Sequence, residues 1–405
     1  MKKNKKLITV FVVVIIILLL LIGFFSFGDK TKILEKYNFP KDLIEQLKNN
    51  ENSDDIAVQN DAISTQAINT SNWDLEKVDI VYDTANVAVP VPKGYVASSV
   101  TGEHTVKTGF VIYEGTKAVT NSNAWNESCN RNQWVWVPVP DASRIYEIDS
   151  NGRKKSKLYD YSSTGRTKRI NNEVEPGVSY LEDFEDNFGN SQLQGMTQDK
   201  LLKEIQNEFD DTINSIETYG GFWIGRYETG NSETKLPVTK RMTKIDYTSN
   251  WYMAYKNIQR MGTGENVKTS MLFGCLWDET LQWFIDTGSK KYEDMINSSS
   301  WGVYDGTTFD YKKADGTTVT KKANESITVP TGSTEYSKNN NIYDMAGNNE
   351  DGTLEAIGYY KVIRGGNFYF DGSSLDKYPV SCRDYEDLSV EMLSNTAFRA
   401  FLYIK

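Results

Sequence analysis

The apolar residues of this chain change their spacing along the sequence, and each spacing predicts a different element. Residues 7–27 carry no charge, residues 73–140 contain short β-branched and aromatic runs, and residues 197–218 repeat apolar side chains every three or four positions. The first pattern is typical of a membrane-spanning helix, the second of strands, and the third of an amphipathic helix. The chain therefore combines an N-terminal apolar segment with a mixed α and β region.

Short runs bounded by proline and glycine predict the strands of this region. The runs are VDIVYDT, VAVPVPKGYVAS, GFVIYEG, NQWVWVPVP and, at 220–230, GGFWIGRYETG. Helices are predicted at 197–218, 249–261 and 277–288, the last ending at Gly288, a C-cap signal. The closing run, NTAFRAFLYIK, predicts a final strand with a Phe-Arg pair.

The flanks of the apolar run predict how the chain is divided. Residues 1–6 form a basic tail, 7–27 an anchor, 28–75 a polar stalk, and 76–405 one folded domain. A helix over the apolar run would be ~31 Å long, which matches the hydrocarbon core of a bilayer. A cleavable signal peptide is the alternative, but its apolar core is normally shorter and a small-residue cleavage site should follow. The lysines before the run predict an N-terminus inside and residues 28–405 outside the cell.

Two polar stretches predict insertions within the folded domain. Residues 141–195 predict little regular structure. Residues 289–340 are rich in Ser, Thr, Lys and Asn and predict a long loop or flap.

Charge and histidine content exclude several functions. The chain has 405 residues and a formal charge of −10 without a basic stripe, which argues against a nucleic-acid partner. Its one histidine, His104, lies in the polar sequence GEHTVKTG, which predicts an exposed loop. Iron sites that need two or three imidazoles are therefore excluded, and a Ser-His-Asp or Cys-His nucleophile would need His104 itself.

The three cysteines, Cys129, Cys275 and Cys382, are too few for a disulfide scaffold. At most one disulfide can form within the chain, so a hydrophobic core must carry its stability. Cys275 lies in GCLWDE, where we expect a buried small apolar side chain.

Roughly the last sixty residues carry the most specific pattern. They contain NNNIYDMAGN, DGTLE, VIRGGNFYF and NTAFRAFLYIK, and WVWVPV, GGFWIGRYE and WDETLQWF precede them in that order. This series resembles the formylglycine-generating enzyme (sulfatase-modifying factor) family, and most of all its bacterial surface and phage-type members. The resemblance covers about residues 80–405. It implies an α+β fold, an irregular C-type-lectin-like domain with short twisted strands and two to three helices.

The resemblance also implies a structural calcium site. The family's Gly-Asn-x-Trp-(Glu/Asp)-Trp-Thr motif aligns without a gap on residues 347–353, where Asn348 and Asp351 keep the amide and the acid. Glu350 and Gly352 stand where tryptophans are usual. Amide, carboxylate and carbonyl oxygens suit Ca²⁺. The alternative is an ordinary turn with solvated acids.

Catalysis in the family depends on copper held by two cysteines, which oxidises a substrate cysteine to formylglycine. That pair is spaced C-x4-C just before the closing strand, whereas Cys382 has Lys377 and Asp387 at the partner positions. Oxidase activity would need Cys382, copper and a cysteine from a distant segment.

The remaining use of the fold is to present a ligand-binding surface. Rigid aromatic rings and adaptable polar groups follow one another at Asn367, Tyr369, Asp371, Arg383, Asp384, Tyr385 and Asp387. They predict a membrane-anchored extracellular recognition module, without catalysis, for a protein or glycan ligand. The alternatives are a formylglycine-generating oxidase acting on a protein cysteine and a structural envelope protein. The same residues are equally consistent with the polar faces of ordinary strands.

Overall fold

The computed structural model describes the part of the chain that follows the predicted anchor. The described residues are 69–120, 131–159, 161, 175–176, 195–231, 236–245, 250–262, 264–357, 360–374, 377–386 and 396–405. The predicted tail, the anchor at 7–27 and most of the stalk lie outside them, as do Cys129 and Asp387. Within the described ranges, no helix has both the length and the apolar character needed to cross a membrane.

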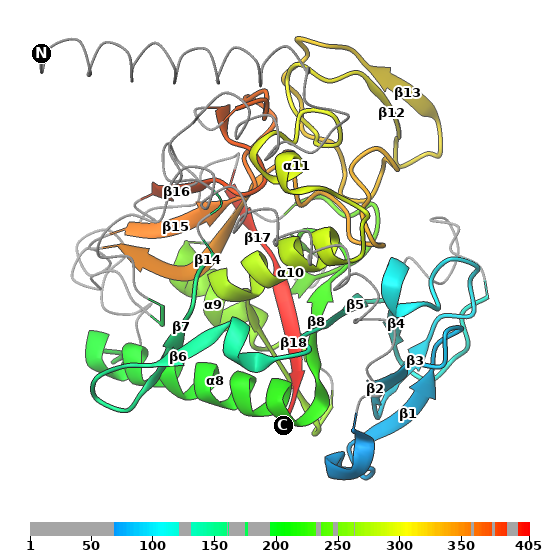
Figure 1. Ribbon diagram of the computed structural model, residues 1–405. Helices are drawn as coiled ribbons and strands as arrows, with labels where there is room; N and C mark the ends of the chain where they lie inside the picture. The colour runs from blue at the N-terminus through cyan, green and yellow to red at the C-terminus, as the bar shows by residue number, and fades with distance from the viewer. Residues whose placement is uncertain are drawn as a thin grey trace, which may run out of the picture. The chain divides into compact units, whose positions relative to one another are not determined.

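A six-stranded antiparallel sheet forms the centre of the fold, in the order β11-β18-β8-β5-β4-β3 (Figure 1). Its strands are β3 (Tyr95–Ala97), β4 (Val111–Glu114), β5 (Gln133–Pro138), β8 (Gly221–Gly225), β11 (Val267–Met271) and β18 (Ala400–Ile404). The final strand β18 lies between β8 and β11, so the last residues of the chain complete the sheet rather than extend its edge. The predicted strands in these segments are confirmed.

A second sheet has the order β16-β15-β14-β17. Its strands are β14 (Glu350–Ile357), β15 (Tyr360–Arg364), β16 (Arg383–Glu386) and β17 (Thr396–Phe398). Strand β17 runs parallel to β14, and the other pairs are antiparallel. Arg399 lies between β17 and β18, so the chain passes from one sheet to the other at this residue.

Four α-helices are described, and the three predicted ones are confirmed. They are α8 (Gln198–Tyr219), α9 (Trp251–Ile258), α10 (Gly274–Asp286) and the short α11 (Tyr292–Ile296). The side chain of Thr197 accepts a hydrogen bond from the Lys200 N–H at the start of α8, and Gly220 ends the helix at a φ of 81°. The apolar stripe of α8 packs on β8 and β18, and α9 packs on β11. Together with the sheets, these helices establish the α+β class.

The segment 289–340 is more regular than its composition predicts, although most of its residues lie in turns and loops. It contains α11 and a hairpin of β12 (Phe309–Lys312) and β13 (Thr318–Lys321). Val303, Phe309 and Val329 form a small core beneath it. Lys321 is buried, and its ammonium donates to backbone carbonyls, including that of Thr307 at 2.9 Å. A few apolar residues and one buried lysine therefore order a segment whose other residues are polar.

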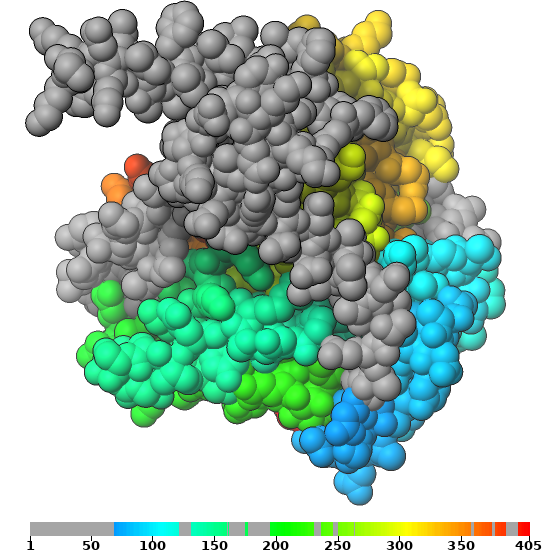
Figure 2. All heavy atoms as spheres, in the orientation of Figure 1, coloured from blue at the N-terminus to red at the C-terminus, as the bar shows by residue number. Residues whose placement is uncertain are grey.

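Small hairpins complete the described structure. They are β1 (Val78–Tyr82) with β2 (Ala88–Pro92), β6 (Tyr146–Ile148) with β7 (Lys154–Ser156), and β9 (Gly230–Asn231) with β10 (Pro237–Val238). Short 3₁₀ turns span Thr70–Asn72, Val106–Thr108 and Ala142–Arg144. Figure 2 shows the β6–β7 hairpin lying along α8, where Lys154 pairs with Glu217 at 3.2 Å. The described start of the stretch 141–195 is thus also more regular than predicted.

Candidate functional site

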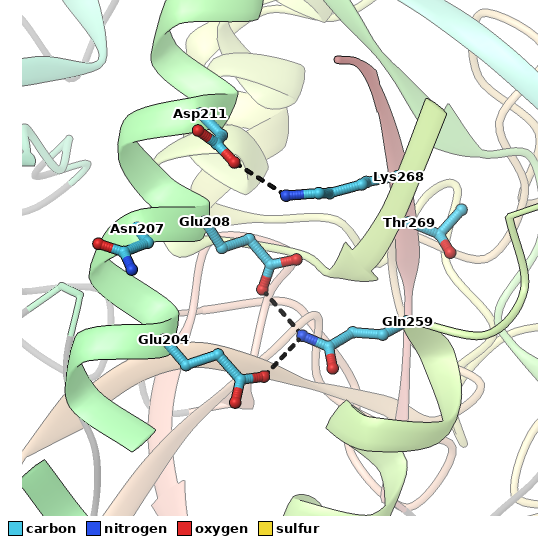
Figure 3. Close-up of a pocket in the computed structure, with 7 residues that line it drawn as sticks. All are labelled: Glu204, Asn207, Glu208, Asp211, Gln259, Lys268 and Thr269. Atoms are coloured by element: carbon cyan, nitrogen blue, oxygen red, sulfur yellow. Dashed lines mark hydrogen bonds and ion pairs between the residues drawn. The ribbon is translucent and has the colours of Figure 1, made fainter. Parts of the chain in front are cut away.

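A pocket of about 410 Å³ lies between α8, α9 and β11, at the outer edge of the six-stranded sheet (Figure 3). It is lined by seven residues with polar side chains, which come from three elements: Glu204, Asn207, Glu208, Asp211, Gln259, Lys268 and Thr269. A volume of this size is in the range of small-molecule binding sites.

The periodicity of α8 places three carboxylates on this pocket. Glu204, Glu208 and Asp211 are four and three residues apart, so they follow one face of the helix. Lys268 projects from β11 opposite them, and its ammonium lies 2.9 Å from the Asp211 carboxylate. Gln259 follows the last turn of α9 and reaches the same space.

Glu208 lies deepest of the three acids, with 6% of its surface exposed. Its Oε2 accepts hydrogen bonds from the Tyr255 hydroxyl at 2.8 Å and from the Gln259 amide at 3.3 Å. The same Gln259 nitrogen donates to Glu204 Oε1 at 3.2 Å, and Glu204 is also paired with Lys256 at 2.6 Å. Within the described residues, Glu208 is the one acid of the pocket without an ion-pair partner.

Burial raises the pKa of Glu208 to about 6, although the hydrogen bonds from Tyr255 and its other neighbours and the charge of Lys268 act against this rise. At pH 7 the carboxylate is therefore mostly ionised, and it becomes protonated within a pH range that cells experience.

Two buried hydroxyls lie beside this carboxylate. Tyr403 is 1% exposed, and its hydroxyl has no hydrogen-bond partner among the described residues. Ser270 is fully buried, and its hydroxyl is among the hydrogen-bonding neighbours that lower the pKa of Glu208. In the β11–β18 register Tyr403 is opposite Lys268. Lys268 precedes Ser270 by two residues on β11, so the side chains of all three residues share one face of the sheet, the face that α8 covers. Burial raises the pKa of Tyr403, and the nearby Glu208 and Asp211 charges add to this rise.

The residues predicted to form a ligand surface do not gather in one place. Asn367 and Arg383 are buried, and Asn367 donates to the Glu350 carboxylate at 2.8 Å. This burial does not fit direct contact with a protein or glycan. Tyr369 and Tyr385 are exposed, at 57% and 46%.

The exposed Tyr369 and Tyr385 lie toward opposite ends of the paired strands β15 and β16. Tyr385 lies beside Tyr360, with ring centroids 5.2 Å apart, whereas the chain reaches Tyr369 only after the far end of β15. Asp371, near Tyr369, is paired with Lys377 at 2.5 Å, and Asp384 on β16 is partly exposed. The exposed residues of the predicted surface that the structure describes thus lie in two separate places, and Asp387 is outside the described residues.

The residues of the predicted calcium site bind neighbouring protein groups. Asn348 Oδ1 accepts a hydrogen bond from the Val329 N–H at 3.0 Å, and the Asn348 amide donates to Glu228. Asp351 Oδ2 pairs with Arg399 at 3.2 Å. The described residues contain no cluster of three or more acidic, histidine or cysteine side chains arranged to hold a metal ion. One oxygen of each side chain is thus bound by protein groups, Asp351 Oδ1 has no hydrogen-bond partner among the described residues, and the calcium site stays a prediction.

Cys382, the cysteine that an oxidase would need, is buried and directly precedes strand β16 of the second sheet. Cys382 and Cys275 are both fully buried and form no disulfide with another described residue. Burial raises the pKa of both thiols well above the usual range, so neither is a thiolate at neutral pH. The expectation of a buried Cys275 is confirmed. His104 differs from its prediction, because it is half-buried with its ring 4.8 Å from Phe110.

A buried ionic network joins α10 to the second sheet. Asp278 of α10 binds Arg364 of β15 at 2.6 Å and also Arg383 of β16. Glu355 of β14 lies 3.4 Å from Arg364 and 3.5 Å from Arg383. All four side chains are completely buried, so the network ties four elements together and explains the position of Arg383.

Glu279, next to this network, predicts a pH-dependent stability. Burial raises its pKa to about 8 despite the Arg144 guanidinium 3.3 Å away. Because the folded-state pKa lies above that of an unfolded glutamate, the contribution of Glu279 to stability is fully present below about pH 4.5 and is lost as the pH rises through 8. Glu279→Gln should therefore stabilise the protein by on the order of 2 kcal/mol at pH 9 and have little effect at pH 5.

Denaturant unfolding of both proteins at the two pH values measures this difference. Glu217→Gln, on the exposed side of α8, is the control and should shift stability by less than about 1 kcal/mol at either pH. An equal effect of Glu279→Gln at pH 5 and pH 9 would show that the carboxyl does not titrate as stated.

No family model, curated protein or solved structure matches this chain. The resemblance to the formylglycine-generating enzyme family therefore stays a prediction from the motifs.

Proposed function

We propose that this chain is a non-catalytic recognition module, anchored in the cell membrane through residues 7–27, that binds an extracellular protein or glycan through the pocket between α8, α9 and β11. In this proposal residues 28–405 lie outside the cell. The domain is an irregular C-type-lectin-like variant of the formylglycine-generating enzyme type.

The placement of the motifs supports this fold. The segments WVWVPV, GGFWIGRYE and AFLYI are far apart in the sequence but provide the adjacent strands β5, β8 and β18. Their order in the sheet is consistent with one domain built from all three, with its C-terminus in the centre.

One observation carries the functional proposal. Carboxylate, amide and hydroxyl groups from three elements converge on an open pocket, and the deepest acid, Glu208, has no ion-pair partner among the described residues. A few converging polar groups are what orient a ligand in a binding site. The buried, protonated thiols of Cys275 and Cys382 favour binding over thiol-dependent oxidation.

Gln259→Leu is expected to weaken ligand binding about tenfold or more, because it removes an amide that holds both Glu204 and Glu208 in place. The full chain, purified in detergent and fluorescently labelled, would be applied to arrays of glycans and of surface-protein peptides. Affinities for the best ligands would then be measured for the wild type and the variant.

Asp199→Asn is the matched control, since Asp199 is an exposed acid on the first turn of the same helix, outside the pocket. It should bind like the wild type. Two outcomes would contradict this function: neither array yields a ligand, or Gln259→Leu leaves the affinity of the ligand unchanged. Either outcome would favour the alternative of a structural envelope protein.

A further inference from the structure

Two exposed tyrosines, Tyr360 of β15 and Tyr385 of β16, contact each other on the surface of the second sheet and are called the tyrosine pair below. Their ring centroids are 5.2 Å apart, and the ring planes are inclined by 51°. Tyr360 is 40% exposed and Tyr385 is 46% exposed. Neither hydroxyl is bonded to another described residue. Both phenols are therefore open to a reagent in the solvent and lie close to each other.

The strand register holds the tyrosine pair together. Tyr385 is opposite Val362, and Tyr360 precedes Val362 by two residues. Side chains two residues apart share a face, so the two rings are diagonal neighbours on one face of the sheet. Further along this face, Arg364 and Arg383 are opposite each other and both belong to the buried ionic network with α10. The network thus fixes the register that brings the rings into contact.

The other exposed tyrosines that the structure describes do not form such a pair. Tyr369 is 57% exposed, but the ring beside it belongs to Phe368, which has no hydroxyl. Tyr292 lies beside Tyr161, which is 3% exposed, and the Tyr292 hydroxyl donates to the Tyr161 carbonyl. Among the described residues, the tyrosine pair alone combines ring contact with exposure of both phenols.

We propose that the tyrosine pair is a site of oxidative cross-linking, at which a peroxidase and hydrogen peroxide join the two rings through a carbon–carbon bond. Each phenol loses one electron and one proton, which gives a phenoxyl radical with spin density on the ring carbons beside the oxygen. The two radicals combine through these carbons, and the hydrogen on each joined carbon then moves to the oxygen of its ring as a proton. Two hydrogen atoms leave the pair in all, and they convert one hydrogen peroxide into two molecules of water.

The cross-link would supply a covalent tie that the described cysteines do not. Cys275 and Cys382 are buried and form no disulfide with a described residue, so neither thiol is exposed to intercept the tyrosyl radicals. Strand β16 is at the edge of its sheet and pairs with β15 alone among the described strands (Figure 1). A bond between the rings would fix this edge strand. The inference goes beyond the proposed function, because the reaction needs the two rings and no ligand.

The test oxidises the full chain in detergent with a haem peroxidase and hydrogen peroxide, followed by trypsin and mass spectrometry. Lys361, Arg364 and Arg383 separate the two tyrosines, so trypsin places them in different peptides. We expect one linked peptide whose mass is that of the two peptides less two hydrogen atoms. Its yield should exceed that of any other tyrosine link by about tenfold or more, because the fold holds these rings together. The chain should remain a monomer on a denaturing gel.

Tyr385→Phe removes one phenol but keeps the ring, so the variant should fold like the wild type and lose the cross-link. Tyr369→Phe is the matched control, since it removes a more exposed tyrosine outside the pair and should leave the yield unchanged. Oxidation should raise the thermal unfolding midpoint of the wild type by about 5 °C or more, because a cross-link constrains the unfolded chain. It should not raise that of Tyr385→Phe.

Oxidation of the chain in urea separates the effect of the fold from that of sequence. Unfolding removes the register, so the preference for the tyrosine pair should disappear. The inference is overturned if the folded chain yields no link between these tyrosines, if the links mainly join separate chains, or if the urea-treated chain gives the same preference. It is also overturned if Tyr385→Phe is cross-linked within the chain as efficiently as the wild type. These outcomes are independent of the ligand arrays, so either proposal can fail without the other.

Discussion

Asp278→Asn is expected to reduce the free energy of unfolding by about 3–5 kcal/mol, among the largest effects of any single substitution in this domain. Asp278 binds Arg364 and Arg383, and all three side chains are completely buried. An amide cannot balance two guanidinium charges that have no access to water. The variant would thus leave positive charge uncompensated in the core.

Denaturant unfolding of the full chain, followed by tryptophan fluorescence, measures the loss. Asp278→Glu keeps the charge but displaces the carboxylate, so its stability should lie between those of the wild type and Asp278→Asn. Glu147→Gln is the control, because it breaks the exposed pair with Lys155 and should cost less than about 1 kcal/mol. A loss for Asp278→Asn as small as that of this control would show that the arginines find other partners or water.

The elements with strong local signals could be predicted from the sequence. Helix α8 was expected at 197–218 and spans Gln198–Tyr219, since a long apolar stripe, a threonine cap and a glycine end all agree. The strand runs bounded by proline and glycine were also found. Local patterning was sufficient here because each of these segments buries one clear face.

The segment 289–340 could not be predicted because its order comes from few residues. Lys321 is a polar residue in the sequence, yet its ammonium is buried and bonded to the carbonyls of Asp305 and Thr307. The small core of Val303, Phe309 and Val329 is spread over the segment without a helical or strand period. Composition therefore suggested a loop where tertiary contacts produce a hairpin.

The candidate site was missed for a similar reason. Glu204, Glu208 and Asp211 follow one face of α8, which in a sequence looks like a solvated helix face. The residues that convert this face into a pocket, Gln259 and Lys268, come from later elements. Acids spaced four and three residues apart were the one signal available, and nothing local marks Glu208 as buried.

The burial of Arg383, one of the residues of the predicted ligand surface, could not be expected from the sequence. Arg383 lies in a polar, tyrosine-containing stretch that suggested an exposed strand. Its partner Asp278 lies more than a hundred residues earlier, and burial of such a pair is invisible to periodicity. Exposed aromatic residues such as Tyr385 were correctly expected at the surface, since they lie on the edge strand β16.

The closing Phe-Arg motif has a structural explanation that bears on the calcium prediction. Arg399 binds the Asp351 carboxylate and donates to the carbonyls of Gly225, Tyr343 and Asp344, at 3.1, 2.9 and 3.1 Å respectively. Carboxylate and carbonyl oxygens are also the ligands that Ca²⁺ prefers. The guanidinium thus supplies a positive charge among these oxygens and joins the two sheets where the chain crosses between them.

Arg399→Met should therefore lower the free energy of unfolding by about 3–5 kcal/mol, because it keeps the aliphatic stem but leaves Asp351 and the carbonyls unpaired. Burial raises the pKa of Asp351 to about 6 although Arg399 lowers it, so removing the guanidinium should raise that pKa further. A carboxyl whose folded pKa lies above its unfolded value loses stability as the pH rises, and the variant should accordingly be more strongly destabilised at pH 8 than at pH 5.

The same unfolding measurements decide between guanidinium and calcium. If Arg399 supplies the positive charge, neither EDTA nor millimolar Ca²⁺ should shift the unfolding midpoint of the wild type, because the guanidinium already pairs with Asp351 Oδ2 and the Val329 N–H already donates to Asn348 Oδ1. A midpoint that rises with Ca²⁺ and falls with EDTA would contradict this and restore the metal predicted from the motif. If Arg399→Met is destabilised equally at both pH values, Asp351 titrates as it does in the wild type. The loss of stability would then come from the lost contacts with the carbonyls.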